Sequence, residues 1–203
     1  MLLGGKCRNC YQPISLLYPS IEILTTVVLS LLYILIPLHY FFAYFIFFSA
    51  LIVTIRSDIE TMLISRFATT FLVPFGCAMS ACGLLPLSLL ESISGAMFGY
   101  SFLFIINSIF KRLRNIDGIG EGDFDLLLFI GSFTGILGCW ATITIGSMLG
   151  SLYGISTLVL AHNNKSAEQS LQNTKIPFGP FLAFGALFFT LAQKQIFYYL
   201  TTN

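Results

Sequence analysis

Long apolar segments separated by short polar ones run through most of this sequence. A helix that crosses a bilayer needs about 20 mostly apolar residues to span a hydrocarbon core of about 30 Å. The pattern predicts seven such spans, the fifth of them short enough to lie partly within the protein. They cover about residues 21–37, 40–55, 68–86, 87–110, 124–137, 138–161 and 178–200. We therefore expect an all-α fold, a polytopic membrane bundle of about seven transmembrane helices.

The overall composition supports a membrane protein and excludes other classes. Hydrophobic residues make up 56% of the chain and charged residues 9%, whereas a soluble domain is about one quarter charged. The net charge of +1 provides no basic surface for nucleic acid. No apolar run precedes Lys6 and Arg8, so we expect no cleavable signal peptide and the first span must target the chain. A lipid bilayer is thus an expected partner and nucleic acid is not.

Basic residues predict the orientation of this bundle. Lysines and arginines concentrate on one side of the seven-span topology, and only Lys194 falls near the other side. The residues on the basic side are Lys6, Arg8, Arg56, Arg66, Lys111, Arg112, Arg114, Lys165 and Lys175. By the positive-inside rule this side is cytoplasmic, which places the amino terminus inside and the carboxyl terminus outside.

The amino-terminal segment, residues 1–20, carries a CxxC motif at Cys7 and Cys10. Two thiolates supply half of a tetrahedral zinc site, and a closed site needs four ligands. A reduced cysteine pair without metal is the alternative reading. We expect no cofactor and no zinc in the monomer; a homodimer that pools two CxxC pairs is the one arrangement that would complete a site.

Two acidic clusters fall at the cytoplasmic ends of separate spans. Asp58 follows the second span, and Asp123 follows alternating glycines in GIGEGD, at Gly118, Gly120 and Gly122. An ionisable group at membrane depth costs several kcal/mol and often marks a pathway, a relay or a catalytic group. Glycine permits positive φ and close backbone approach, which suits a shaped loop. The alternative is that each acid is a helix-end charge in the wet interface and the loop is ordinary.

A pair of aspartates at one depth predicts acid–base chemistry. Two carboxylates about 4 Å apart repel by about 4 kcal/mol at an effective dielectric near 20, so such a pair would hold one proton. The ionised member can take a proton from water while the protonated member polarises a carbonyl. Other hydrolytic mechanisms lack residues, because there is no HExxH motif and His39 and His162 are isolated. GIGEGD also lacks the lysine of a phosphate-binding loop.

Four motifs in order resemble those of the type IV prepilin peptidases, the GxGD class of membrane aspartyl proteases. They are GKCRNC with YPSIE, DIETMLI from Asp58, GIGEGD ending at Asp123, and KIPFGPFLAFGA from Lys175 to Ala186. The resemblance implies that Asp58 and Asp123 are the catalytic pair, with the three glycines in an active-site loop. The further residues that match the family motifs are Tyr18, Pro19, Glu22, Pro177, Gly179 and Pro180.

The resemblance implies an endopeptidase of the bacterial cytoplasmic membrane. Residues 21–203 would form its transmembrane peptidase domain, and residues 1–20 a cytoplasmic remnant of the CxxC region. Its substrates would be type IV prepilins or type II secretion pseudopilins, whose short basic leader is removed on the cytoplasmic side.

The chain also departs from the family pattern. It begins just before the family's second CxxC, so we expect a shortened form without the four-cysteine metal site or N-methyltransferase activity. Asp125 stands where the family has lysine, and Ser65 where it has proline. A catalytically impaired relative that binds prepilin or acts as a scaffold is the alternative function. A proton-coupled transporter would explain the two aspartates but neither the glycines nor the IPFGP sequence.

Overall fold

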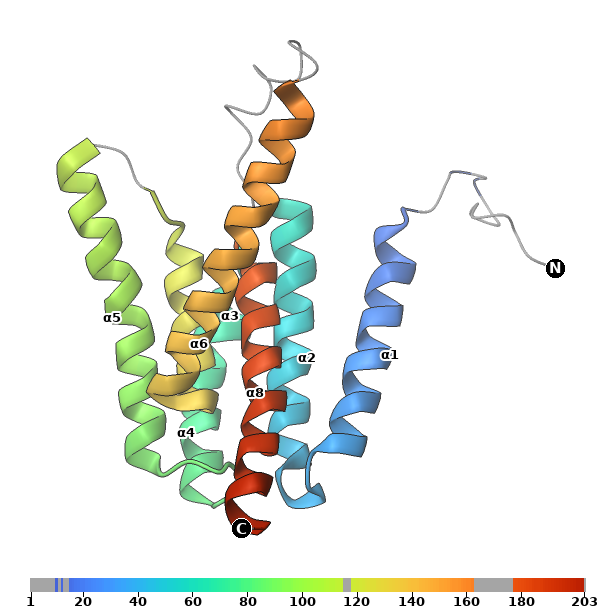
Figure 1. Cartoon of the computed structure of the whole chain (residues 1–203), viewed down its shortest axis with the longest axis vertical. Coiled ribbons are helices and arrows are strands. Elements are labelled where there is room, and N and C mark those ends of the chain that lie inside the picture. The colour runs from blue at the N-terminus through green and yellow to red at the C-terminus, as the bar shows by residue number, and fades with distance from the viewer. Residues whose placement is uncertain (1–9, 11, 13–14, 115–117, 163–176, 203) are drawn as a thin grey trace.

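All regular structure in the described part of the chain is helical. The computed structural model describes residues 10, 12, 15–114, 118–162 and 177–202, and no strand occurs among them. The elements are α1 (Leu17–Leu35), α2 (Leu38–Thr61), α3 (Arg66–Thr69), the 3-10 turn η1 (Thr70–Leu72), α4 (Val73–Ala81), α5 (Leu89–Arg114), α6 (Glu121–His162) and α8 (Gly179–Thr202). Figure 1 shows these helices as a bundle, with α1 at its side.

Several helices have the length and composition of membrane spans. Helices α1, α2 and α5, together with residues 121–159 of α6, are long and apolar enough to cross a bilayer, and residues 179–193 of α8 form a shorter apolar helix. This supports a multi-pass membrane bundle.

The expected fifth and sixth spans form one element, α6, which folds back on itself. Its backbone leaves helical geometry at Gly135, with φ 70° and ψ −172°. The Cys139 sulfur lies 3.8 Å from the Leu127 carbonyl oxygen, although residues that far apart in a straight helix are separated by about 18 Å. Figure 1 shows the two parts, yellow and orange, running in different directions. Glycine suits this position because positive φ costs it little.

The expected count of seven helices is therefore wrong. Among the described residues, six helices exceed one turn, namely α1, α2, α4, α5, α6 and α8. The count falls short because the two spans around Gly135 join without an intervening loop, and no charged residue or proline marks the bend.

The expected third span, residues 68–86, is also not a single helix. It is divided into α3, η1 and α4, and α4 has only nine residues. Pro74 lies in the first turn of α4. Proline has no backbone N–H and clashes with the preceding turn, so it starts a helix more readily than it continues one. The apolar pattern predicted a span here but could not predict its interruption.

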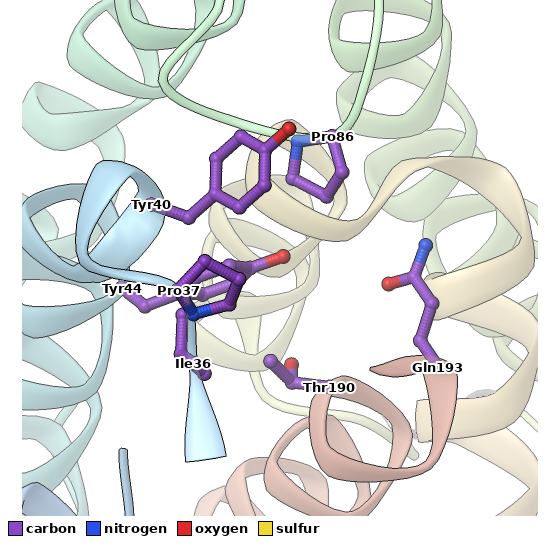
Figure 2. A pocket seen from close by; sticks show the side chains of 7 residues that line it. All are labelled: Ile36, Pro37, Tyr40, Tyr44, Pro86, Thr190 and Gln193. Atoms are coloured by element: carbon purple, nitrogen blue, oxygen red, sulfur yellow. The ribbon is translucent and has the colours of Figure 1, made fainter. Parts of the chain in front are cut away.

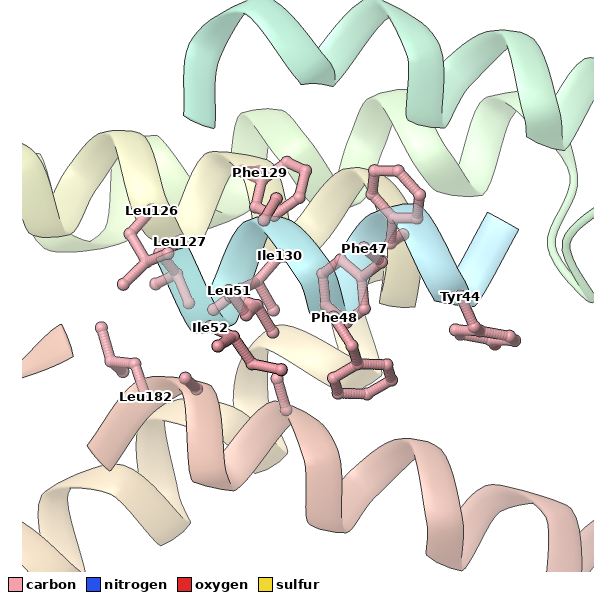
Figure 3. Close-up of a cluster of buried hydrophobic side chains, with 14 of the residues drawn as sticks. Tyr44, Phe47, Phe48, Leu51, Ile52, Leu126, Leu127, Phe129, Ile130 and Leu182 are labelled. Atoms are coloured by element: carbon pink, nitrogen blue, oxygen red, sulfur yellow. The ribbon is translucent and has the colours of Figure 1, made fainter. Parts of the chain in front are cut away.

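The core of the bundle forms around α2. The Phe47 ring stacks on the Phe133 ring of α6, with centroids 4.9 Å apart. The centroid of the Phe129 ring lies 5.3 Å from that of Phe47. Leu51 of α2 and Leu182 of α8 are buried in the same cluster. Figure 3 shows Phe47, Leu51, Phe129 and Leu182 of this cluster. Within a bilayer, such packing stabilises the bundle mainly through van der Waals contact, because a side chain that faces lipid tails is also in apolar surroundings.

Glycines allow α5 and α6 to approach closely. A Cβ atom added at Gly131 would overlap the Gly95 carbonyl oxygen, and one added at Gly99 would overlap the Leu127 carbonyl oxygen. Small residues at helix interfaces in membranes allow such backbone contacts. This contact fixes the first part of α6 against α5.

We predict that Gly131→Ala destabilises the protein, by about 1–3 kcal/mol, because the new methyl meets backbone that cannot move alone. Gly150→Ala is the matched control, since its Cβ would lie 3.5 Å from a Phe178 ring carbon, an ordinary contact. Thermal unfolding in detergent measures both variants. Equal midpoints for the two would contradict the close-contact interpretation.

Candidate active site

The two aspartates predicted from sequence lie on one cavity. Asp58 belongs to the last turn of α2, and Asp123 to the first turn of α6. These helix ends and the start of α8 lie toward the same end of the bundle (Figure 1). The cavity has a volume of about 700 Å³. Its lining residues are Asp58, Met62, Phe102, Leu103, Ile106, Gly118, Ile119, Gly120, Asp123, Ile143, Ser147, Pro177 and Phe178.

Asp58 is a buried carboxylate that contacts the start of another helix. Its side chain is buried, and its Oδ2 accepts a hydrogen bond of 3.0 Å from the Gly179 N–H of α8. The first N–H groups of a helix have no partner within that helix and carry partial positive charge. This end of α8 therefore favours a negative charge on Asp58.

Asp123 lies close enough to Asp58 for their charges to interact. Its backbone N–H donates to the Gly120 carbonyl oxygen at 3.1 Å, which closes the turn that leads into α6. Like charges held together in a partly dehydrated site do not both ionise readily. The geometry can therefore support a carboxyl pair that shares one proton, as the chemistry of acid–base catalysis requires.

Two of the three glycines of GIGEGD, Gly118 and Gly122, pack closely against other side chains. The described residues with positive φ are Met62, Gly83 and Gly135, so none of the three loop glycines uses that freedom. A Cβ at Gly118 would lie 2.7 Å from the Phe110 ring, and one at Gly122 would lie 2.8 Å from Ile64 Cβ. The expectation of close approach is thus met at Gly118 and Gly122 but not at Gly120, where a Cβ would lie 3.5 Å from Asp123 Oδ2, and none of the three has left-handed backbone.

Asn107 is a site residue that sequence reasoning missed. Its Oδ1 accepts hydrogen bonds from the N–H groups of Gly118 and Ile119, at 3.0 and 3.1 Å. This side chain of α5 holds the loop that precedes Asp123. An amide inside an otherwise apolar stretch was the available signal, because a polar group at membrane depth needs a partner.

The matched motif of the last helix reaches the site. Pro177 lines the cavity, and Gly179 donates to Asp58. A Cβ at Gly179 would lie 2.7 Å from Asp58 Oδ2. Pro180 lines a separate apolar cavity between α1, α2 and α8, of about 170 Å³.

The motif on α1 does not reach the aspartate cavity. Tyr18, Pro19 and Glu22 are not buried, and none of them lines that cavity. The Arg56 guanidinium lies over the Tyr18 ring at 4.8 Å from its centroid, a cation–π contact that links α1 to α2. In this arrangement the motif contributes to helix association rather than to the cavity.

The CxxC pair is described only in part. Cys10 is exposed with a free thiol, and Cys7 lies outside the described residues. Elsewhere in the described ranges, no group of three or more His, Cys, Asp or Glu side chains is placed to hold a metal ion.

A second cavity lies at the opposite end of the bundle. Its volume is about 160 Å³, and Figure 2 shows its lining from the α1–α2 turn, the α4–α5 connection and α8. The lining residues are Ile36, Pro37, Tyr40, Tyr44, Pro86, Thr190 and Gln193. It carries hydroxyl and amide groups but no carboxylate, so the acid–base pair belongs to the first cavity.

Comparisons with known proteins agree with the resemblance seen in the sequence. A family model described as "Type IV leader peptidase family" matches residues 45–155, and one described as "Bacterial Peptidase A24 N-terminal domain" matches residues 1–36. No solved structure matches the chain.

Curated relatives carry the name prepilin leader peptidase/N-methyltransferase. One from Aeromonas hydrophila is 30% identical, over 99% of this chain and 67% of the relative. One from Pseudomonas aeruginosa is 31% identical, over 97% and 65%, and one from Burkholderia pseudomallei is 32% identical, over 90% and 57%. The chain thus spans about three fifths to two thirds of their length. Because the first family model covers more than half of the chain, this protein belongs to the type IV leader peptidase family.

Proposed function

We propose that this protein is a membrane aspartyl endopeptidase that removes the leader of type IV prepilins or type II secretion pseudopilins, with Asp58 and Asp123 as its catalytic pair. The observation that carries the proposal is that these two carboxyl groups, from separate helices, line the same cavity. Family membership and the names of the relatives support the substrate class. Lipid surrounds the bundle in this proposal.

The proposed reaction is general acid–base hydrolysis of a peptide bond. The ionised carboxylate takes a proton from water, whose oxygen attacks the scissile carbonyl carbon while the protonated carboxyl group donates to the carbonyl oxygen. The C–N bond then breaks as the leaving amine takes a proton from the pair and a hydroxyl of the diol intermediate returns one to it, so that the products are a carboxylic acid and an amine and the pair again holds one proton. The Gly179 N–H favours the negative charge on Asp58. Asp58 is accordingly the base and Asp123 the acid in the attack step.

Amide substitutions test the pair. We expect Asp58→Asn and Asp123→Asn each to abolish leader removal, because an amide has nearly the same shape but cannot act as base or acid. Glu60→Gln is the matched control, since this exposed acid pairs with Arg56 at 3.5 Å and does not line the cavity. The measurement is the gel shift of a co-expressed prepilin, with membrane levels of each variant determined by immunoblot.

Two results would contradict the proposal. If either aspartate variant cuts at a rate comparable to wild type, the catalytic pair is wrongly assigned. If wild type cuts no prepilin or pseudopilin of its host, the alternative of a relative that binds prepilin or serves as a membrane scaffold replaces the peptidase.

Gly179→Ala tests the hydrogen bond to Asp58 separately from the carboxyl group. Alanine favours a helix more than glycine does, so α8 should remain intact. Its methyl would lie 2.7 Å from Asp58 Oδ2 and displace it. We expect leader removal to slow by about 10- to 100-fold, the scale of a displacement near 1 Å. Gly150→Ala should cleave at the wild-type rate. Equal cleavage rates for the two variants would show that the contact between Gly179 and Asp58 does not affect the reaction.

The proposed orientation places the aspartate cavity on the cytoplasmic side. Among described basic residues, Arg56, Arg66, Lys111, Arg112 and Arg114 belong to the helix ends near this cavity. The positive-inside rule assigns such an end to the cytoplasm.

Cysteine labelling tests this orientation. Cys82 is exposed near the opposite end, after α4. In a variant that retains only Cys82, a membrane-impermeant maleimide should label intact spheroplasts. In a cysteine-free variant with Glu60→Cys, labelling should require permeabilisation. The reverse pattern would invert the topology.

A further inference from the structure

Arg66 contacts both sides of the turn that carries Asp123. Its Nη2 lies 2.7 Å from Glu121 Oε2, and its Nε lies 3.2 Å from Asp125 Oδ2. These acids stand two positions before and two positions after Asp123 in the first turns of α6. One guanidinium therefore joins the start of α3 to the part of α6 that places Asp123.

The segment that ends at Arg66 begins at Asp58. The Met62 N–H donates to the Asp58 carbonyl oxygen at 3.0 Å, and the left-handed backbone of Met62, with φ 55°, ends α2. The Ser57 hydroxyl donates to the Leu63 carbonyl oxygen at 2.7 Å, which holds the chain against α2. Residues 62–66 thus form a short connection between the helix end of Asp58 and the first turn of Asp123.

Ile64 adds a packing contact to this connection. A Cβ on Gly122 would lie 2.8 Å from Ile64 Cβ, so the residue beside Asp123 packs directly on the loop. The segment meets α6 through one apolar contact and two ion pairs.

The two ion pairs differ in their surroundings. The Glu121 side chain is 80% exposed, and exposed ion pairs contribute little because water and salt screen them. The Asp125 side chain is only 14% exposed, so its attraction to Arg66 is screened less. The planar fork of arginine can contact both acids at once, whereas lysine presents a single compact charge.

We propose that Arg66 is a positioning residue for the reaction, which sets Asp123 against Asp58 by holding Asp125 and Glu121. This inference rests on the proposed function for its kinetic test but on the geometry above for its structural part. It also explains why an acid suits position 125 in this chain: a lysine there would face Arg66 with like charge.

The kinetic test uses the intact membrane protein and a prepilin substrate. Arg66→Ala should lower kcat by about 10- to 100-fold and leave KM within about twofold, because the carboxyl pair is displaced while the substrate surface remains. The kcat of Arg66→Lys should lie between those of wild type and Arg66→Ala. Arg112→Ala is the matched control, an exposed arginine at the end of α5, and should cleave like wild type.

Charge reversal separates positioning from a general effect on folding. Arg66→Glu and Asp125→Arg should each lower kcat, and the double variant should recover most of the wild-type kcat. In the double variant the two charges exchange places, so positions 66 and 125 still attract each other, and the introduced arginine also lies one helical turn from Glu121. The proposal is overturned if the double variant, present in the membrane at the wild-type level, is no faster than the single variants, or if Arg66→Ala retains the wild-type kcat.

Hydrogen–deuterium exchange provides a readout that needs no catalysis. Amides of residues 119–126 should exchange faster in Arg66→Ala than in wild type or Arg112→Ala, and slow again in the double variant. If wild type cuts no prepilin, the proposed function fails but this measurement still decides the inference. Unchanged exchange in Arg66→Ala overturns it, and faster exchange that the double variant reverses supports it.

Discussion

The placement of two carboxyl groups in an apolar bundle, Asp58 buried and Asp123 half-buried, is the constraint on which this structure depends. A charge at membrane depth is unfavourable unless dipoles, hydrogen-bond donors or an opposite charge compensate it. The protein meets this need by bringing helix ends together, where backbone N–H groups lack partners within the helix. Gly179 at the start of α8 donates to Asp58, and the loop before Asp123 is held by Asn107. Irregular backbone at this depth is tolerated because it lines a cavity within the protein.

Close helix packing determines where these ends lie. The Gly95–Gly131 contact brings α5 and α6 within backbone distance, and the bend at Gly135 returns the chain toward the end of the bundle where Asp123 lies (Figure 1). The two parts of α6 can then contact α5 and α8 while Asp123 lines the cavity. A side chain at either glycine would separate the helices and shift the first turn of α6 with them.

The sequence predicted an all-helical membrane bundle and singled out two aspartates that line one cavity, because both predictions depend on strong local signals. Apolar runs indicate membrane helices, and two acids after such runs are costly enough to require an explanation. It failed at the third span and at Gly135, where one proline and one glycine interrupt a continuous apolar pattern. Hydropathy indicates which segments can lie in the membrane, but it does not indicate where a helix bends or is interrupted. The contacts of Arg66 join elements that are distant in sequence, so no local pattern could reveal them, whereas the amide of Asn107 within an apolar stretch was a signal that went unused.

The cavities at the two ends of the bundle differ in the chemical groups that line them. The cavity at the α1–α2 turn offers hydroxyl and amide groups from Tyr40, Tyr44 and Gln193, which can donate or accept hydrogen bonds but cannot serve as a strong base at neutral pH. The cavity at the other end combines two carboxyl groups with a helix start, so negative charge can be held there and a proton exchanged. Hydrolysis of a peptide bond requires both capacities at once. The aspartate cavity brings them together, whereas the cavity at the opposite end does not.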